Sequence, residues 1–179
     1  MLRLFVALPV SEEAADAFLG LQGGLPGARW QPEENLHLTL AFLGDTREPD
    51  AEDLMQALAD LPDGPVPLKP REIATFGRPH QPRSLVVLLE ESARLMALQA
   101  RVESTARALG LEPDRRKFTP HITLGRCGRN VEPAGMERWL AGHIGAALPE
   151  WVAEEMILYS SIMRPEGSLY RAEAIYPLF

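Results

Sequence analysis

The sequence has little of the features that would assign it to a disulfide-rich, zinc-binding or membrane class. It has one cysteine, Cys127, so neither an internal disulfide nor a thiolate cluster for zinc can form. No apolar run approaches the ~18–20 residues of a membrane span. The apolar opening at 2–8 is interrupted by Arg3 and followed by Pro9, which disfavours a signal peptide. We expect a cytoplasmic protein that does not engage a membrane.

Positive charge is also scarce. The 179 residues include 18 Lys and Arg against 25 Asp and Glu, for a net charge of −7, whereas a protein that binds nucleic acid over its whole surface should be basic. Residues 115–129 are the exception, since they carry a charge of +5 and no acid, which leaves −12 for the other residues. This basic window favours a local anionic ligand over a long polyanion track, the alternative being a solvated loop.

The chain contains an internal repeat. Asn35–Leu40 (NLHLTL) is echoed 84 positions later by Thr119–Leu124 (TPHITL). The apolar run at 4–8 is echoed 81 positions later at 85–89, and each run precedes an amphipathic segment. The pattern predicts strand–helix–strand–helix–strand twice, closed by a final strand at 169–176.

We predict one α+β domain over residues 1–179. Its two repeats, about 1–76 and 84–179, form lobes that face each other across a pseudo-twofold axis, an arrangement that allows the lobes to exchange terminal strands. Ser11 is expected to cap the first helix and Gly110 to end the third. The expected strands are 4–8, 36–40, 66–76, 85–89, 121–124, 151–160 and 169–176, and the expected helices start at Ser11, span 49–59, run from near Ser92 to Gly110, and span 133–146.

The two histidine segments carry the chemistry. Side chains alternate between the faces of a strand, so His37 and Thr39 share one face, as do His121 and Thr123 in the second copy. If the repeats face each other, two imidazoles and two hydroxyls surround one small volume. One imidazole can remove a proton while the other donates one, and the hydroxyls can bind phosphoryl oxygens.

This set of groups suits displacement at a phosphate ester, and it requires neither a metal ion nor a cofactor. The other two histidines, His80 and His143, lie outside the repeat and are expected to be surface or capping residues.

Several segments together resemble a known family. His37-Leu38-Thr39-Leu40 and His121-Ile122-Thr123-Leu124 are similar to the paired His-x-Thr-x signatures of the two-histidine (2H) phosphoesterases. The chain most resembles the LigT-like RNA 2′,3′-cyclic phosphodiesterases of bacteria and archaea, also called 2′–5′ RNA ligases. The likeness extends to the opening strand, to both core segments and to the C-terminal turn, at Arg3–Leu8, Glu34–Gly44, Pro120–Arg126 and Pro165–Tyr170.

The resemblance implies two antiparallel sheets lining a central cleft, with helices outside. It implies hydrolysis of RNA or nucleotide 2′,3′-cyclic phosphates to 2′-phosphomonoesters, with ligation as the reverse reaction. His37 would be the proton donor, His121 the acceptor, and Arg126 the cation that binds the phosphate. Strict alternation puts Arg126 on the face opposite Thr123, so we expect Gly125 to bend or end the strand there.

Further cleft residues are expected with less support from the pattern. Phe5 either stacks on a base or belongs to the core. Tyr170 and Ser161 are expected near the cleft, and Phe42 is expected in the core because it alternates with Leu40.

Three other functions fit parts of the pattern. The substrate could be another small cyclic phosphate of the ADP-ribose type. A binding module for RNA ends would need the basic window but not both histidines. A metal-dependent phosphodiesterase would need clustered His, Asp or Glu ligands, which are sparse near His37 and absent near His121. The chain is expected to be a monomer, with no protein partner implied.

Overall fold

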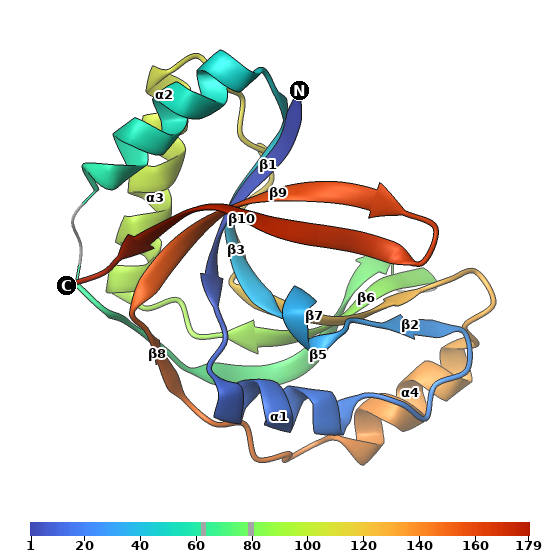
Figure 1. The fold of residues 1–179 in the computed structure, drawn as a ribbon. Coiled ribbons are helices and arrows are strands. Elements are labelled where there is room, and N and C mark those ends of the chain that lie inside the picture. The colour runs from blue at the N-terminus through green and yellow to red at the C-terminus, as the bar shows by residue number, and fades with distance from the viewer. Residues whose placement is uncertain (62–63, 79–80) are drawn as a thin grey trace.

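The computed structural model describes residues 1–61, 64–78 and 81–179, so the expectation for His80 falls outside the described residues. Figure 1 shows the arrangement of the elements. The strands are β1 (Leu2–Pro9), β2 (Ala28–Trp30), β3 (His37–Thr46), β4 (Val66–Leu68), β5 (Pro70–Arg78), β6 (Gln81–Leu89), β7 (His121–Cys127), β8 (Trp151–Ala153), β9 (Glu155–Arg164) and β10 (Gly167–Pro177). The helices are α1 (Glu12–Leu21), a 3₁₀ turn η1 (Glu33–Asn35), α2 (Glu48–Ala59), α3 (Ala93–Ala108) and α4 (Pro133–Gly142).

The strands that carry the histidine segments lie side by side at the centre of the larger sheet. That sheet has the order β10-β9-β1-β3-β7-β6-β5, with β2 also paired to β7, and all of its pairings are antiparallel. The α+β class and the antiparallel pairing are therefore confirmed. The two expected sheets are joined, but only at the pair Leu38↔Ile122. We call the two sides of this junction the β3 half (β1, β3, β9, β10) and the β7 half (β2, β5, β6, β7).

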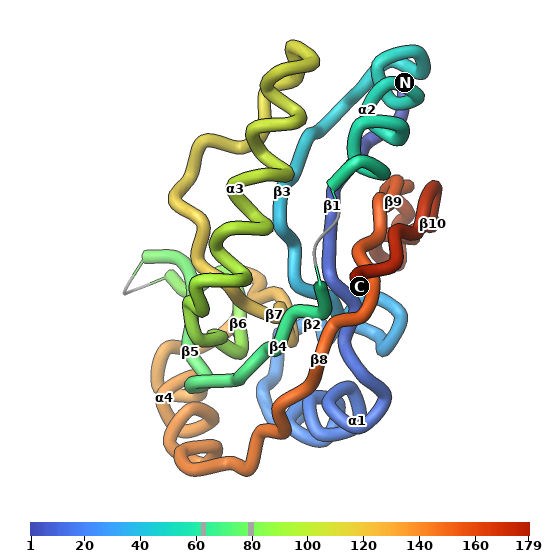
Figure 2. Tube along the Cα trace, turned by 90° about the vertical axis from the view of Figure 1, so that its left-hand side faces the viewer, coloured from blue at the N-terminus to red at the C-terminus, as the bar shows by residue number. Residues whose placement is uncertain are grey.

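Each half takes elements from both repeats. The C-terminal strands β9 and β10 extend the β3 half through β1, while β5, from the first repeat, pairs with β6 in the β7 half. The helices also cross over: α3 packs on β3 beside α2, and α1 lies with α4 on the β7 half (Figures 1 and 2). The connections explain this exchange, because β1 ends at Pro9, paired with His37 beside the junction of the two halves, and only two residues separate it from α1.

Two predicted strands are each divided by one residue. The predicted strand 66–76 breaks at Lys69 into β4 and β5, and the predicted strand 151–160 breaks at Glu154 into β8 and β9. The first pieces pair with each other, as β4 with β8, and the second pieces join opposite halves of the larger sheet. A single straight strand could not make both pairings, so the chain turns at each break.

Local signals explain the ends of the helices. The Oγ atoms of Ser11 and Ser92 accept hydrogen bonds of 3.2 Å from the backbone N–H groups of Ala14 and Leu95, which confirms the cap predicted at Ser11 and shows a matching cap at Ser92. Gly110 follows the end of α3 with φ +78°, one residue beyond the actual cap. Helix α4 is shorter than predicted and ends at Gly142. Within the described ranges, no helix combines the length and apolarity needed to cross a membrane.

Gly125 on β7 is closely covered by the β2 strand. A Cβ atom at this position would lie 2.8 Å from Cε3 of Trp30 and 3.1 Å from the carbonyl oxygen of Arg29. The equivalent position of the first histidine segment is Ala41, which carries a Cβ. The second copy therefore requires glycine where the first does not.

We predict that Gly125→Ala lowers the free energy of unfolding by about 1–3 kcal/mol, because Trp30 must move away from β7. The matched control is Gly20→Ala in α1, where nothing lies within 4 Å of the added Cβ. That change should stabilise the protein by about 0.5–1 kcal/mol. Urea unfolding measures both effects, and a Gly125→Ala protein as stable as the wild type would contradict the packing argument.

Candidate active site

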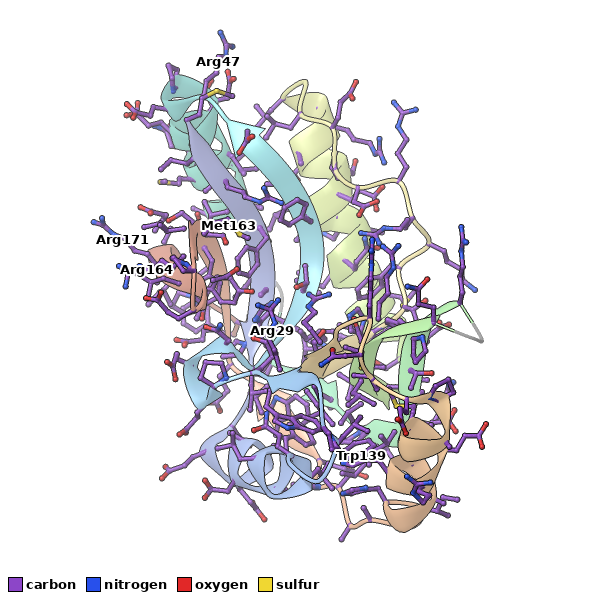
Figure 3. All side chains as sticks on the ribbon, turned by 90° about the vertical axis from the view of Figure 1, so that its right-hand side faces the viewer. Arg29, Arg47, Trp139, Met163, Arg164 and Arg171 are labelled. Atoms are coloured by element: carbon purple, nitrogen blue, oxygen red, sulfur yellow. The ribbon has the colours of Figure 1, made fainter. Side chains whose placement is uncertain are left out.

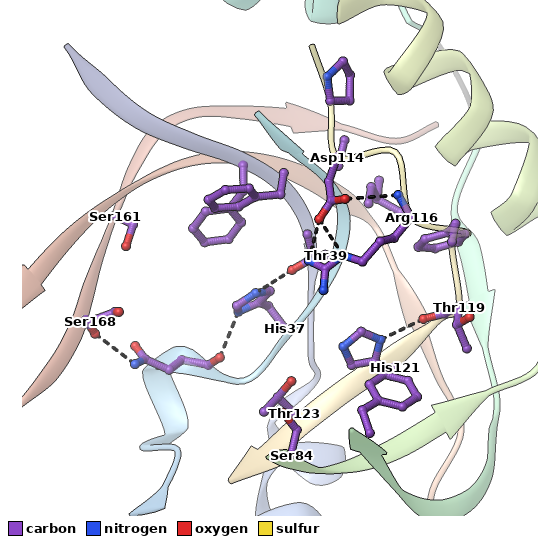
Figure 4. Close-up of a pocket in the computed structure, with 18 of the residues that line it drawn as sticks. His37, Thr39, Ser84, Asp114, Arg116, Thr119, His121, Thr123, Ser161 and Ser168 are labelled. Carbon is purple, nitrogen blue, oxygen red and sulfur yellow. Dashed lines mark hydrogen bonds and ion pairs between the residues drawn. The ribbon is translucent and has the colours of Figure 1, made fainter. Parts of the chain in front are cut away.

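A cavity of about 700 Å³ lies between the two halves of the sheet. His37 and Thr39 line it from β3, and His121 and Thr123 line it from β7. Figure 4 shows both imidazole rings and both threonines around the same space. The leucines and isoleucine that alternate with them are buried, so alternation holds through both segments as predicted: Leu36, Leu38, Leu40, Ile122 and Leu124.

A backbone carbonyl two residues earlier holds each imidazole. Nδ1 of His37 lies 2.8 Å from the carbonyl oxygen of Asn35, and Nδ1 of His121 lies 2.7 Å from that of Thr119. A carbonyl oxygen only accepts, so Nδ1 carries the proton in both rings. Each neutral ring therefore has an unprotonated Nε2. In His37 this atom accepts a 2.9 Å hydrogen bond from the hydroxyl of Thr39.

The site disfavours the charged form of both histidines in the absence of a ligand. Burial lowers the pKa of His37 to about 4, and electrostatic interaction with His121 and Arg126 lowers it further. Burial also lowers the pKa of His121, with Arg126 and Arg116 contributing. An anion bound between the rings would oppose these causes and favour the charged form of either imidazole.

A β-bulge in each histidine strand changes which residues face the cleft. On β3, Thr39 is paired with Ala7 and Ala41 with Val6, so Leu40 has no partner. The extra residue shifts the alternation, and Phe42 enters the cleft lining. The expectation that Phe42 belongs to the core is therefore wrong.

The second bulge does the same for Arg126. On β7, Thr123 is paired with Val86 and Gly125 with Leu85, so Leu124 is the residue without a partner. Arg126 consequently lines the cleft with Thr123, and its Nη1 donates a 3.2 Å hydrogen bond to Ser84 Oγ. The strand continues past Gly125 to Cys127, so a bulge, rather than the expected bend or end at Gly125, turns Arg126 inward.

Aromatic side chains surround His37. The ring of Phe5 lies 4.9 Å from that of His37, 5.2 Å from Tyr159 and 4.9 Å from Tyr170, between centroids. Phe5 is only 3% exposed although it lines the cleft, so it is both a core residue and part of the wall behind His37. Tyr170 and Ser161 also line the cleft, as expected.

Several cleft residues were not anticipated from the sequence. Phe76 packs edge-on against His121 with 4.7 Å between ring centroids, and Ser84 holds Arg126. The guanidinium of Arg3 lies 5.2 Å from the centroid of Phe42. Alternation along β1 and β6 would have identified Arg3 and Ser84, but only the pairing of the strands brings Phe76 to His121.

The basic window divides between the cleft and the surface. Arg116, Lys117 and Arg126 line the cleft, with Arg116 held by Asp114 (Nε to Oδ2, 2.8 Å). Arg115 instead lies within 4.0 Å of Glu112. Arg3 and Arg83 add positive charge to the lining from outside the window.

Other arginines lie outside the cleft lining. Arg29 on β2 is the cross-strand neighbour of Arg126, and Figure 3 places it near the centre of the molecule. Arg164 and Arg171 lie on the β9–β10 hairpin. In the part of the chain that the structure describes, no three His, Cys, Asp or Glu side chains form a group that could hold a metal ion.

Comparison with known proteins matches the chain to one family. The family model described as LigT like Phosphoesterase matches it twice, over residues 8–86 and 87–170. The chain is 32% identical to the RNA 2′,3′-cyclic phosphodiesterase of Thermotoga maritima, over 95% of this chain and 92% of the relative. It is 31% identical to that of Thermus thermophilus, over 94% and 86%. A Geobacillus stearothermophilus protein of the same name is 32% identical over 97% of this chain, which spans only 56% of that relative.

Solved structures share the fold. The protein TT0787 of Thermus thermophilus superposes with a TM-score of 0.78 at 26% identity, covering 98% of this chain and 97% of that one. LigT of E. coli superposes with a TM-score of 0.74 at 23% identity, covering 99% and 97%.

We predict that stability depends on pH through His37. Its pKa in the folded protein, about 4, lies below the ordinary 6.5, so the unfolded chain binds more protons between these values. The wild type should therefore lose stability as the pH falls from 7 to 4, by roughly 3 kcal/mol from this residue. His37→Gln should lack that loss. The measurement is urea unfolding of both proteins across this range, and parallel curves would show that His37 titrates normally.

Proposed function

The chain belongs to the LigT-like phosphoesterase family, and on that premise we propose that it hydrolyses 2′,3′-cyclic phosphates at RNA ends or on nucleotides to 2′-phosphomonoesters. The observation that carries the proposal is the pair of imidazoles on adjacent strands, each fixed through Nδ1 and each presenting Nε2 to one cavity. Relatives named RNA 2′,3′-cyclic phosphodiesterase support the substrate class.

The two rings act on opposite sides of the phosphorus. Nε2 of His121 takes a proton from water as the water oxygen bonds to phosphorus. The bond from phosphorus to the 3′ oxygen breaks, and Nε2–H of His37 protonates that oxygen, leaving a 2′-phosphate and a free 3′ hydroxyl. The assignment of donor and acceptor follows the family resemblance. In ligation a 5′ hydroxyl takes the place of water: its oxygen bonds to the phosphorus of the 2′,3′-cyclic phosphate as His121 removes its proton, and the same bond to the 3′ oxygen breaks, which gives a 2′–5′ linkage and a free 3′ hydroxyl.

Substrate binding favours protonation of His37, the proposed acid. With a pKa of about 4, His37 is protonated in only about one molecule in a thousand at pH 7 in the free protein. The anionic phosphate stabilises the imidazolium, so the proton is held when substrate is present. Thr39, Thr123 and Arg126 then contact the phosphoryl oxygens, with Arg126 oriented by Ser84.

Both histidines and both threonines of the proposed mechanism belong to one chain, and on that ground we propose that the protein acts as a monomer. The aromatic wall of Phe5 and Tyr170 supports His37 and bounds the nucleoside side of the cleft. The catalytic scheme uses only side chains and therefore needs no metal ion or cofactor. RNA ends as substrates, together with the single cysteine, favour the cytoplasm.

The activity is tested directly on defined substrates. We expect 2′,3′-cyclic AMP and an oligonucleotide ending in a 2′,3′-cyclic phosphate to give 2′-monophosphates, identified by phosphorus NMR. Activity should survive exhaustive EDTA treatment. A 3′-monophosphate product would contradict the proposed displacement, and activity lost to EDTA and restored by zinc or manganese would assign a metal-dependent reaction. Turnover of an ADP-ribose cyclic phosphate alone would change the substrate class.

The second prediction for this site concerns the paired histidines. His37→Ala and His121→Ala should each lower turnover by ~10²–10⁴, because each removes one of the two proton transfers. The double variant should lose far less than the product of the single effects. His143→Ala is the matched control, since His143 ends α4 and contacts Trp139 outside the cleft. Near-normal turnover in either single variant would refute the two-histidine mechanism.

A further inference from the structure

A glutamine side chain binds the backbone at each of the two β-bulges. Nε2 of Gln22 lies 3.1 Å from the carbonyl oxygen of Leu124, the unpaired residue of the β7 bulge. Nε2 of Gln99 lies 3.3 Å from the carbonyl oxygen of Leu40, the unpaired residue of the β3 bulge. Gln22 and Gln99 thus make the same contact in the two halves.

The contact supplies a hydrogen-bond donor to a carbonyl group that a bulge leaves unpaired. The extra residue leaves the regular ladder of hydrogen bonds, and its carbonyl still needs donors when it is buried. Leu40 and Leu124 are both almost fully buried, and a glutamine amide supplies a donor to each carbonyl. The backbone N–H of Gln31 supplies one donor to Leu124, and Gln22 supplies another.

The two glutamines do not occupy equivalent positions of the repeat. Ser92 follows Ser11 by 81 positions, and the same offset from Gln22 leads to Glu103, not to Gln99. Gln22 caps the end of α1, whereas Gln99 lies within α3. Because these helices cross to the opposite half, each glutamine comes from one repeat and holds the bulge of the other.

We infer that Gln22 is a positioning residue for Arg126, and that Gln99 has the same role for Phe42. Each glutamine holds the bulge that turns the next cleft residue inward. The inference rests on the proposed function in one respect, namely that Arg126 binds the substrate phosphate.

The contacts of Gln22 are the stronger of the two. Both hydrogens of its amide are used on backbone carbonyls, at 2.7 Å to Gln31 and 3.1 Å to Leu124. They join the bulge to the segment that leads from β2 toward His37. The second donor contact of Gln99 goes to the side chain of Glu103 at 2.9 Å. The larger effect on catalysis is therefore expected from Gln22.

Hydrogen exchange tests the positioning without reference to activity. Gln22→Met keeps the length of the side chain and removes its donors. We expect amide exchange of Gly125 and Arg126, followed by NMR, to become at least about threefold faster while exchange at Ala41 and Phe42 is unchanged. Gln99→Met should speed exchange at Ala41 and Phe42 and leave exchange at Gly125 and Arg126 unchanged. Gln56→Met, at an exposed position of α2, is the control. Unchanged exchange at the β7 bulge would overturn the inference.

A double-mutant cycle then tests the consequence for catalysis. In the wild-type background, Gln22→Met should raise KM for 2′,3′-cyclic AMP about threefold to tenfold with a smaller change in kcat. In the Arg126→Ala background, Gln22→Met should change KM almost no further. Any change in KM that Gln99→Met causes in the wild-type background should also appear in the Arg126→Ala background.

Equal effects of Gln22→Met in both backgrounds would mean general destabilisation and would overturn the inference. If Arg126→Ala leaves KM unchanged, the proposed role of Arg126 in binding phosphate fails. The exchange measurement still decides, in that case, whether Gln22 holds the bulge.

Discussion

The cleft depends on a single backbone pairing between the two halves of the sheet. β3 and β7 meet only at Leu38 and Ile122, the residues that directly follow the two histidines. This one pair places His37 and His121 on neighbouring strands, with both side chains facing the cleft. A longer ladder would hold the strands together along their length and close the space between them. Because pairing stops after one step, the strands diverge and leave a cavity of about 700 Å³.

In that geometry the cleft disfavours a protonated imidazole, and a bound anion would favour one. Burial and nearby positive charge lower the pKa of both imidazoles, yet the proposed acid must carry a proton. A phosphate between the rings supplies the missing negative charge and shifts both equilibria in the same direction. Protonation of the acid is thereby coupled to occupation of the site, so the free protein does not hold a buried imidazolium ion, which would cost stability.

Much of the site could be predicted from the sequence because it depends on local periodicity. Alternation in two short strands was sufficient to place His37, Thr39, His121 and Thr123 on cleft faces, and the cap at Ser11 followed from local chemistry. Phe42 was misplaced, and the bend expected at Gly125 was wrong, because a bulge depends on pairing with a partner strand. The exchange of α1 and α3 between halves depends on where β1 and β6 end in space. The contact of Phe76 with His121 likewise joins β5 to β7 through an intervening strand, which no single-strand pattern encodes.

The duplicated scaffold carries different side chains at matching positions, and this difference gives the cleft a direction. On the β7 side, the paired residues Ser84 and Arg126 place a hydroxyl and a cation beside Thr123. On the β3 side, the corresponding pair is Phe5 and Phe42, of which Phe5 packs against His37. A symmetric pair of histidines could not distinguish the two ends of a phosphodiester. The paired residues differ between the two sides, and this difference breaks that symmetry. In the proposed reaction, Arg126 would favour phosphate oxygens on the β7 side, which fits a proton donor at His37 on the other side.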